Sequence, residues 1–193
     1  KPSMSVSMPV FYHCDRANAL KPNTTLNLYQ PTVQDDDLHQ FYFDLVFPNG
    51  VTMHGDNYFF RTCHAQDPNY VRSRRIELIF EKVRRIRAPN RPSRAMSVFG
   101  VLSLEDAEAF LRLVKESGSE RQASVWKVEA EQAFVTNMKL LHAYSSRAWT
   151  ERLAEEYWAG SVGPSEFGPP LWEVLMVPPV RVLEKVDRIM SGQ

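Results

Sequence analysis

Short runs of branched and aromatic residues predict strands along this chain of 193 residues. The runs cover residues 10–14, 95–102, 124–130, 171–177 and 180–189. A further run at 41–47 ends at a PNG turn, so we expect residues 58–61 to return beside it as a hairpin partner. The stretch 133–143 fits either a strand or a helix.

Three other segments place apolar residues at helical spacing, and each is bounded by residues that favour helix ends. They lie between Asn69 and Pro89, between Ser103 and Gly118, and between Ser146 and Gly160. Strands and helices follow one another without a regular βαβ rhythm, so the pattern predicts an α+β fold. Residues 1–9 are small and polar with two prolines and predict a flexible arm, which leaves residues 10–193 as a single domain.

Lysine and arginine total 23, and so do aspartate and glutamate, so the net charge indicates no class of partner. The distribution is uneven, because nine basic residues fall between Arg72 and Arg94 against only two acidic ones. A helix in this segment would present a basic face. The chain has no apolar run of the about 18 residues that a membrane span requires. It also lacks the motifs of phosphate-binding loops, serine hydrolases and zinc proteases.

The two cysteines, Cys14 and Cys63, each lie beside a histidine, which raises the question of a zinc site. Adjacent residues on a strand point to opposite faces of a sheet, so both members of such a pair could not easily reach one metal ion. We therefore expect no metal cofactor. Two cysteines are also too few for a disulfide framework and suggest structural thiols or a reducing compartment.

Three fragments, taken in chain order, resemble the motifs of H-Y-E-type ADP-ribosyltransferases. FYHCDRANAL at 11–20 is similar to the first motif, a strand that ends in histidine before a polar turn. SRAMSVFGVLSLEDAEAFL at 93–111 resembles the second motif, a strand that ends in an aromatic residue before a helix. LWEVLMVPPVRVLEKV at 171–186 resembles the third motif, in which a glutamate lies on an apolar strand, as in the DNA-targeting toxins of this family. The resemblance implies an ADP-ribosyltransferase-like fold, a split mixed β-sheet core with flanking helices.

The resemblance also implies roles for single residues. Glu173 would be the catalytic carboxylate, facing the positive charge that develops on the ribose when nicotinamide leaves NAD. His13 would act with it by holding a ribose hydroxyl, and the backbone of Cys14 would meet the nicotinamide amide. Ser97 and Phe99 would lie near the nicotinamide. Cys14 stands where relatives commonly have glycine, and Phe99 where they usually have tyrosine.

Other residues are candidates for the remaining parts of the substrates. The pyrophosphate of NAD requires a guanidinium, and Arg16 and Arg94 lie beside two of the motifs. In related enzymes the loop before the catalytic glutamate helps to select the acceptor, which makes Glu166 and Phe167 candidate acceptor contacts. The basic helix expected at 70–87, which carries Arg84 and Arg85, would hold the phosphates of a nucleic acid acceptor.

Together these features predict an NAD-dependent ADP-ribosyltransferase toxin, with NAD as a substrate and nucleic acid as the acceptor. RNA is the favoured acceptor, by similarity to the carboxy-terminal toxin domains of bacterial Rhs effectors, and protein is the second choice. The resemblance implies a larger secreted effector that acts in the cytoplasm of the target cell, and a cognate immunity protein. Two alternatives stay open: an NAD glycohydrolase, and a non-catalytic nucleic-acid-binding module built on the basic helix.

Overall fold

Strands and helices follow one another along the whole chain. The computed structural model describes residues 8–31, 45–61, 66–116, 123–143 and 146–187. The strands are β1 (Val10–Asp15), β2 (Thr25–Leu26), β3 (Val98–Gly100), β4 (Ser124–Glu129), β5 (Ala133–Asn137), β6 (Trp172–Met176) and β7 (Val180–Val186). The helices are α2 (Met53–Gly55), α3 (Pro68–Arg87), α4 (Leu104–Glu116) and α5 (Arg147–Ala159). This composition confirms the α+β class.

The strands form two sheets that meet edge to edge. The four-stranded sheet has the order β1-β4-β7-β2, and the three-stranded sheet has the order β3-β6-β5. Tyr12 on β1 and Val101, just after β3, exchange backbone hydrogen bonds of 3.0 and 2.8 Å, so the two sheets are neighbours there. Every pairing between described strands is antiparallel, so the expected mixed sheet is wrong in this respect. For example, α5 connects the neighbours β5 and β6 and returns the chain in the opposite direction.

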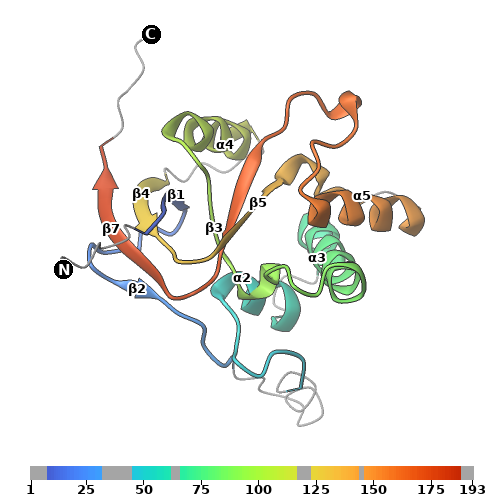
Figure 1. The fold of residues 1–193 in the computed structure, drawn as a ribbon, viewed down its shortest axis with the longest axis horizontal. Coiled ribbons are helices and arrows are strands. Elements are labelled where there is room, and N and C mark those ends of the chain that lie inside the picture. The colour runs from blue at the N-terminus through green and yellow to red at the C-terminus, as the bar shows by residue number, and fades with distance from the viewer. Residues whose placement is uncertain (1–7, 32–44, 62–65, 117–122, 144–145, 188–193) are drawn as a thin grey trace, which may run out of the picture.

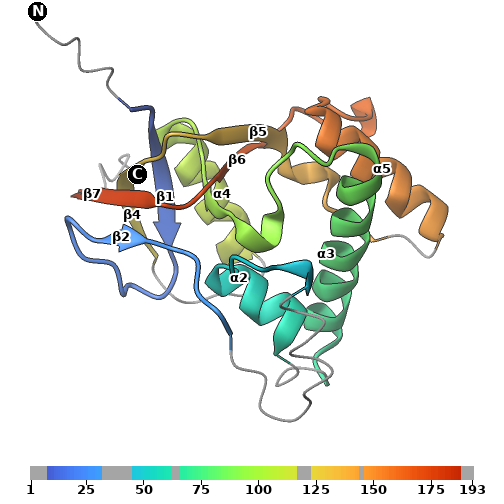
Figure 2. The same cartoon turned by 60° about the horizontal axis from the view of Figure 1, so that its bottom comes forward.

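The three-stranded sheet lies between two other layers. In both Figure 1 and Figure 2, the four-stranded sheet lies on one side of it, and α3 and α5 lie on the other side. Residues 173–176 of β6 are therefore all buried. Leu175 packs with the core of α3 and α5, whereas Val174 and Met176 pack with the four-stranded sheet. Because both faces of this strand are covered, its carboxylate at Glu173 requires polar partners.

Helix α3 supplies much of one wall of the molecule. It begins after Asp67, whose side chain accepts a hydrogen bond of 2.9 Å from the backbone N–H of Asn69. The helix cap is thus two residues before the predicted one, because Pro68 can occupy the first helical position. The buried residues of α3 are Ile76, Glu77, Phe80, Glu81 and Val83. Its apolar stripe therefore includes two carboxylates, and their partners decide what each one does.

Two predicted strands are helical instead over most of the residues that the structure describes in them. Leu45 and Val46, in the run at 41–47, are helical, and the first four residues of that run lie outside the described residues. The hairpin partner expected at 58–61 is mostly a π-helical turn. Aromatic residues of both segments pack into one buried cluster, so tertiary packing overrides their strand propensity. The strand expected at 95–102 is shorter, because a 3-10 turn takes its first two residues.

The other predicted elements are confirmed with shifted ends. The hydroxyl of Ser103 accepts a hydrogen bond of 3.1 Å from the backbone N–H of Asp106 at the start of α4. Gly160 ends α5 with a left-handed φ of 71°. The ambiguous stretch 133–143 is β5 followed by a 3-10 turn. No helix in the described ranges is long and apolar enough to cross a membrane.

Candidate active site

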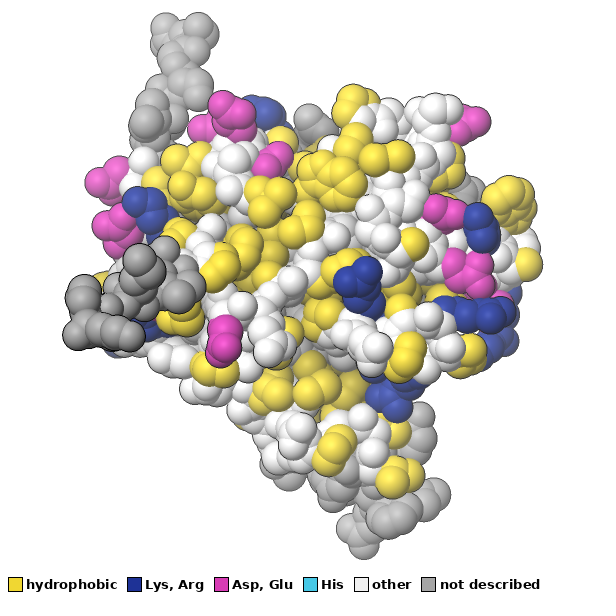
Figure 3. Space-filling model, in the orientation of Figure 1, with side chains coloured by type: hydrophobic (Ala, Val, Ile, Leu, Met, Phe, Trp, Pro, Cys, Tyr) yellow, Lys and Arg dark blue, Asp and Glu magenta, His cyan; other side chains and the backbone are white. Residues whose placement is uncertain are grey.

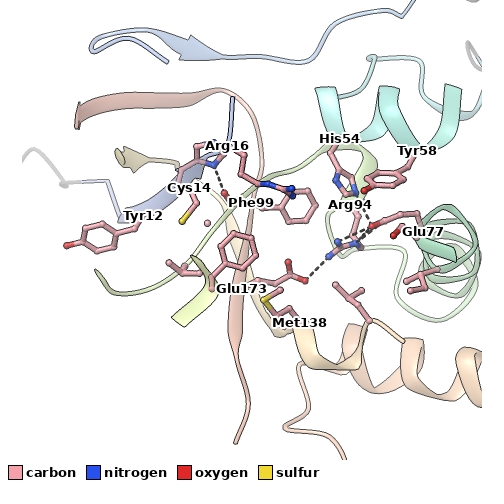
Figure 4. Close-up of a pocket in the computed structure, with 17 residues that line it drawn as sticks. Tyr12, Cys14, Arg16, His54, Tyr58, Glu77, Arg94, Phe99, Met138 and Glu173 are labelled. Carbon is pink, nitrogen blue, oxygen red and sulfur yellow. Dashed lines mark hydrogen bonds and ion pairs between the residues drawn. The ribbon is translucent and has the colours of Figure 1, made fainter. Parts of the chain in front are cut away.

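A cavity of about 420 Å³ opens where the strands face α2 and α3. Figure 4 shows two walls, one from the strands and one from the helical segments. The strand wall is lined by Tyr12, His13, Cys14, Phe99 and Glu173, and the helical wall by His54, Tyr58, Ser73 and Glu77. Arg94 lies between the two walls and is joined to Glu77 and Glu173 by dashed lines in Figure 4.

His13 lies near the end of β1 and lines the cavity. Its Nδ1 lies 2.6 Å from the backbone carbonyl oxygen of Phe99, and a carbonyl only accepts, so Nδ1 carries the proton. Burial lowers the pKa of His13, although the Phe99 carbonyl and Asp15 act in the opposite direction. A neutral ring that donates from Nδ1 keeps a lone pair on Nε2. His13 can therefore accept a hydrogen bond from a ligand hydroxyl.

The polar turn after β1 is organised by one carboxylate. Asp15 is buried, and its two oxygens accept hydrogen bonds from the backbone N–H groups of Ala17 (3.0 Å) and Leu20 (2.9 Å). This bonding fixes the path of the chain immediately after His13. Arg16 is carried on this turn, is exposed and lines the cavity, so its guanidinium is accessible to an anionic ligand.

Glu173 presents its carboxylate to the cavity from β6, where it is paired in register with Thr136 of β5. Its Oε1 accepts hydrogen bonds from Arg94 Nη1 and from the hydroxyl of Tyr157, both at 2.7 Å. Burial raises the pKa of Tyr157 well above its ordinary value, so the hydroxyl stays protonated and donates. Among the described residues no group donates a hydrogen bond to Oε2. That oxygen remains for a ligand.

Arg94 is the centre of a buried group that we call the cavity network: Glu77, Arg94, Tyr157 and Glu173. The Arg94 fork meets Glu77 through Nε and Nη2, each at 3.0 Å, while Nη1 meets Glu173. The guanidinium carbon lies 4.6 Å from the centroid of the Phe99 ring and 5.4 Å from that of Tyr157. Burial acts to lower the pKa of Arg94, but Glu173 and Glu77 outweigh it and raise that pKa well above its ordinary value.

This geometry changes the expected role of Arg94. Arg94 is only 5% exposed, and its fork is directed at a carboxylate of the protein rather than at the open part of the cavity. A pyrophosphate would have to compete with Glu77 for the same donors. Of the two arginines expected to hold the pyrophosphate, Arg16 is the one with an accessible guanidinium.

The residues of the site that were not expected from the sequence include His54, Glu77 and Tyr157. His54 Nε2 lies 2.9 Å from Glu77 Oε1, and the His54 ring centroid lies 4.6 Å from that of Phe99. Burial acts to raise the pKa of Glu77, but Arg94 and then His54 outweigh it and lower that pKa to about 2. One signal was available, since Glu77 precedes Phe80 by three residues on the apolar stripe of a helix. Tyr157 lies at helical spacing on the apolar stripe of α5, so the sequence alone does not distinguish it from an ordinary core residue.

Three other expected contacts do not line the cavity. Ser97 is 1% exposed, and its hydroxyl donates a hydrogen bond of 2.7 Å to the backbone carbonyl of Ser93. Glu166 and Phe167 lie on the 3-10 turn Ser165–Phe167, where Phe167 stacks on His142 with ring centroids 5.3 Å apart. The cavity therefore brings together His13, Cys14, Arg16, Arg94, Phe99 and Glu173, but not these three residues.

Arg84 and Arg85 belong to a second group, the Glu81 network: Glu81, Arg84, Arg85 and Ser93. Glu81 Oε1 accepts from Arg84 Nη2 (2.8 Å) and Arg85 Nε (2.7 Å), and Oε2 accepts from the hydroxyl of Ser93 (2.8 Å). Arg84 also donates to two backbone carbonyls in the loop 89–91. In Figure 3 Lys and Arg side chains on the right of the molecule likewise lie beside Asp and Glu. Internal pairs thus engage much of the expected basic face.

The described residues contain no group of three or more His, Cys, Asp or Glu side chains that could hold a metal ion. Of the two Cys-His pairs, Cys63 and His64 lie outside the described ranges. In the other pair, His13 donates a hydrogen bond to the Phe99 carbonyl and lines the cavity.

Comparison with known proteins gives a family but no activity. A family model described as "Protein of unknown function (DUF2441)" matches residues 11–188. The match includes all four residues of the cavity network. It also includes every described strand in full, apart from Val10 at the start of β1. No curated protein matches the chain. The function therefore has to be argued from the site.

Proposed function

This chain belongs to the DUF2441 family of proteins of unknown function, and we propose that it is an NAD-dependent ADP-ribosyltransferase. The observation that carries the proposal is that His13 of β1, Phe99 of β3 and Glu173 of β6 line one cavity. Each comes from a different fragment that resembles the ADP-ribosyltransferase motifs. Chance similarity of three short fragments gives no reason for these residues to converge. The split into two neighbouring sheets is also what that resemblance implies.

The proposed reaction breaks the bond between the nicotinamide nitrogen and C1′ of the ribose. Nicotinamide leaves with the bonding electron pair, and positive charge develops on C1′ and the ring oxygen. Glu173 Oε2, the carboxylate oxygen without a protein donor, would accept a hydrogen bond from a ribose hydroxyl and stabilise that charge. An acceptor hydroxyl or amine then forms the new bond to C1′ and releases its proton to solvent.

Binding of NAD would use the strand wall and the turn after β1. The Nε2 lone pair of His13 would accept a hydrogen bond from the second ribose hydroxyl, since Nδ1 is already hydrogen-bonded to the Phe99 carbonyl. The Phe99 ring offers the nicotinamide an apolar face but no hydroxyl. Arg16 would bind the pyrophosphate. Cys14 lines the cavity, and its backbone would meet the nicotinamide amide.

For the acceptor we propose nucleic acid, with RNA favoured over DNA and with protein as the second choice. Arg84 and Arg85 are engaged with Glu81, but Arg72 and Arg75 are exposed on α3 and form no ion pair with a described residue. These two would hold phosphates close to the helical wall. The same resemblance supports a toxin role within a larger secreted effector, delivered to the target-cell cytoplasm and neutralised by a cognate immunity protein.

The test uses the purified chain with NAD labelled in its adenylate phosphate, together with total RNA, DNA or a protein extract. We expect nicotinamide release and label on RNA, and loss of both in the Glu173→Ala chain while its circular dichroism spectrum is unchanged. Release of nicotinamide without label on any pool would indicate an NAD glycohydrolase instead. Salt-dependent RNA binding without any turnover of NAD would indicate a non-catalytic binding module. Undiminished activity of Glu173→Ala would contradict the proposed site.

A further inference from the structure

We infer that Glu77 is a positioning residue for the reaction: as the counter-ion of Arg94, it preserves the negative charge that Glu173 presents to the cavity. This inference rests on the proposed function, because it concerns the carboxylate that would stabilise the transition state. The resemblance assigns no role to Glu77, which lies outside all three fragments.

The hydrogen bonds of Arg94 are divided unequally between its two carboxylates. Glu77 receives the fork, with Arg94 Nε at 3.0 Å from its Oε2 and Nη2 at 3.0 Å from its Oε1. Glu173 receives only Nη1, at 2.7 Å from one oxygen. A fork of two parallel hydrogen bonds is the strongest and most directional arrangement for this pair of groups. The position of the guanidinium is therefore set mainly by Glu77.

Two aromatic rings close to the guanidinium restrict it further. Phe99 and Tyr157 lie 4.6 and 5.4 Å from its central carbon. With the fork fixed on Glu77, Nη1 donates to the Tyr157 hydroxyl and to Oε1 of Glu173, and no hydrogen bond joins it to Oε2. Oε2 is then left toward the cavity, which is the orientation that a ribose hydroxyl requires. Glu77 thus positions Glu173 through Arg94.

The charges lead to the same conclusion. The cavity network contains two carboxylates and one guanidinium, and its Tyr157 stays protonated because burial raises the pKa of that hydroxyl. The network therefore carries a net charge of minus one. If Arg94 faced Glu173 alone, the pair would be neutral and would stabilise a developing positive charge only weakly. Glu77 restores the charge that Arg94 removes.

The test is the substitution Glu77→Gln, assayed as nicotinamide release from NAD in the presence of total RNA. The assay is run at the same pH for every chain. Gln keeps the size and most hydrogen-bonding capacity of the residue but removes its charge. We expect kcat to fall about tenfold or more, because only the transition state carries the positive charge. KM for NAD should change less than about threefold.

Two further variants separate this effect from a loss of structure. Glu77→Asp keeps the charge and should have a kcat between those of the wild type and Glu77→Gln. Glu81→Gln is the matched control, because Glu81 lies one turn further along α3, is 6% exposed and is also paired with arginine. It should lower the melting temperature but leave kcat unchanged. Glu77→Gln itself should fold, since it leaves Arg94 and Glu173 as a neutral pair rather than an unpaired charge.

The outcomes are distinguishable from failure of the proposed function. A wild-type chain that releases no nicotinamide overturns both the proposed function and this inference. A wild-type chain that turns over NAD, together with a Glu77→Gln chain of equal kcat, overturns the inference alone. An equal loss of kcat in Glu81→Gln would also overturn it, because the effect would then be structural. If Glu77→Gln does not fold, the Glu77→Asp chain decides: its shorter side chain keeps the charge but displaces the fork on Arg94, so a wild-type kcat there would contradict the positioning role.

Discussion

Glu77 and Glu81 lie one turn apart on α3, are 5% and 6% exposed, and are both paired with arginine, yet they belong to different kinds of network. The partners of Glu81 come from nearby in the chain, between 3 and 12 residues away. The cavity network instead joins segments that are distant in sequence, since Arg94 and Glu173 are 79 residues apart. The first network secures the end of one helix to the next loop. The second assembles a cavity from several elements.

Solvent distinguishes the two networks as well. The side chains of Arg84 and Arg85 are 13% and 39% exposed, whereas that of Arg94 is 6% exposed. Burying an arginine with two carboxylates carries a large desolvation cost, which the mutual attraction offsets only when the hydrogen bonds are well placed. A network of this kind is weak evidence for stability alone. The comparison therefore favours a chemical role for the cavity network under the proposed function, and a structural role for the Glu81 network.

The largest expected effect comes from Glu173→Gln, which removes the charge at the cavity but leaves the fork between Glu77 and Arg94. Nicotinamide release should fall about 10³-fold, because the carboxylate acts mainly on the transition state. Single-turnover assays with labelled NAD measure this change. Glu108→Gln, at an exposed position on α4, should retain wild-type activity. A Glu173→Gln chain within tenfold of wild type would contradict the assignment.

The stability of the two networks can be compared by removing one arginine from each. Arg94→Met leaves two buried carboxylates without their arginine and should lower the free energy of unfolding by about 3–5 kcal/mol. Arg84→Met leaves Glu81 with Arg85 and the Ser93 hydroxyl, so its loss should be about 1–2 kcal/mol. Urea denaturation at pH 7 measures both. Equal losses would contradict the expectation that Arg94 contributes more to the stability of the fold than Arg84 does.

The sequence predicts the strands that carry the site better than it predicts the site's second carboxylate. The strand positions of His13 and Glu173 follow from runs of branched and aromatic residues, and the structure has them in β1 and β6. Glu77 could not be placed in the same way, because its partner Arg94 is in a 3-10 turn whose position depends on tertiary contacts. Local sequence patterns predict local structure. Pairings between segments that are distant in sequence become visible only in the tertiary structure.

The segments that differ from their predicted structure have a similar physical origin. The aromatic residues before α3 have strand propensity, but they form helical turns because a cluster with Phe47 buries them that way. The basic segment predicted a solvated face, but an acidic residue on the buried side of the same helix engages two of its arginines. In both cases the local propensity and the charge of the segment were identified correctly. Burial in the tertiary structure then determined the conformation of the aromatic segment and the partners of the arginines.

Acid should distinguish Glu77 from its neutral replacement. The pKa of Glu77 is lowered to about 2 from an ordinary value of 4.5, chiefly by Arg94 against the effect of burial. A lowered carboxylate pKa stabilises the fold above the unfolded-state value, and this contribution is lost as the pH falls toward the folded-state value. The difference in unfolding free energy between wild type and Glu77→Gln should therefore shrink by about 2 kcal/mol between pH 5 and pH 3. Urea denaturation across that range measures it, and a constant difference would contradict the pairing.

The smallest expected effect separates two arginines of the cavity itself, the buried Arg94 and the exposed Arg16. If Arg16 binds the pyrophosphate in both the ground state and the transition state, Arg16→Gln should raise KM for NAD about tenfold and leave kcat nearly unchanged. The exposed pair between Arg152 and Glu156 on α5 gives the control, since Arg152→Gln removes a surface charge far from these elements in sequence and should change neither constant. Added salt should raise KM in the wild type more than in Arg16→Gln, because the missing attraction can no longer be screened. A fall in kcat without a change in KM would instead place Arg16 near the reacting atoms rather than near the phosphates.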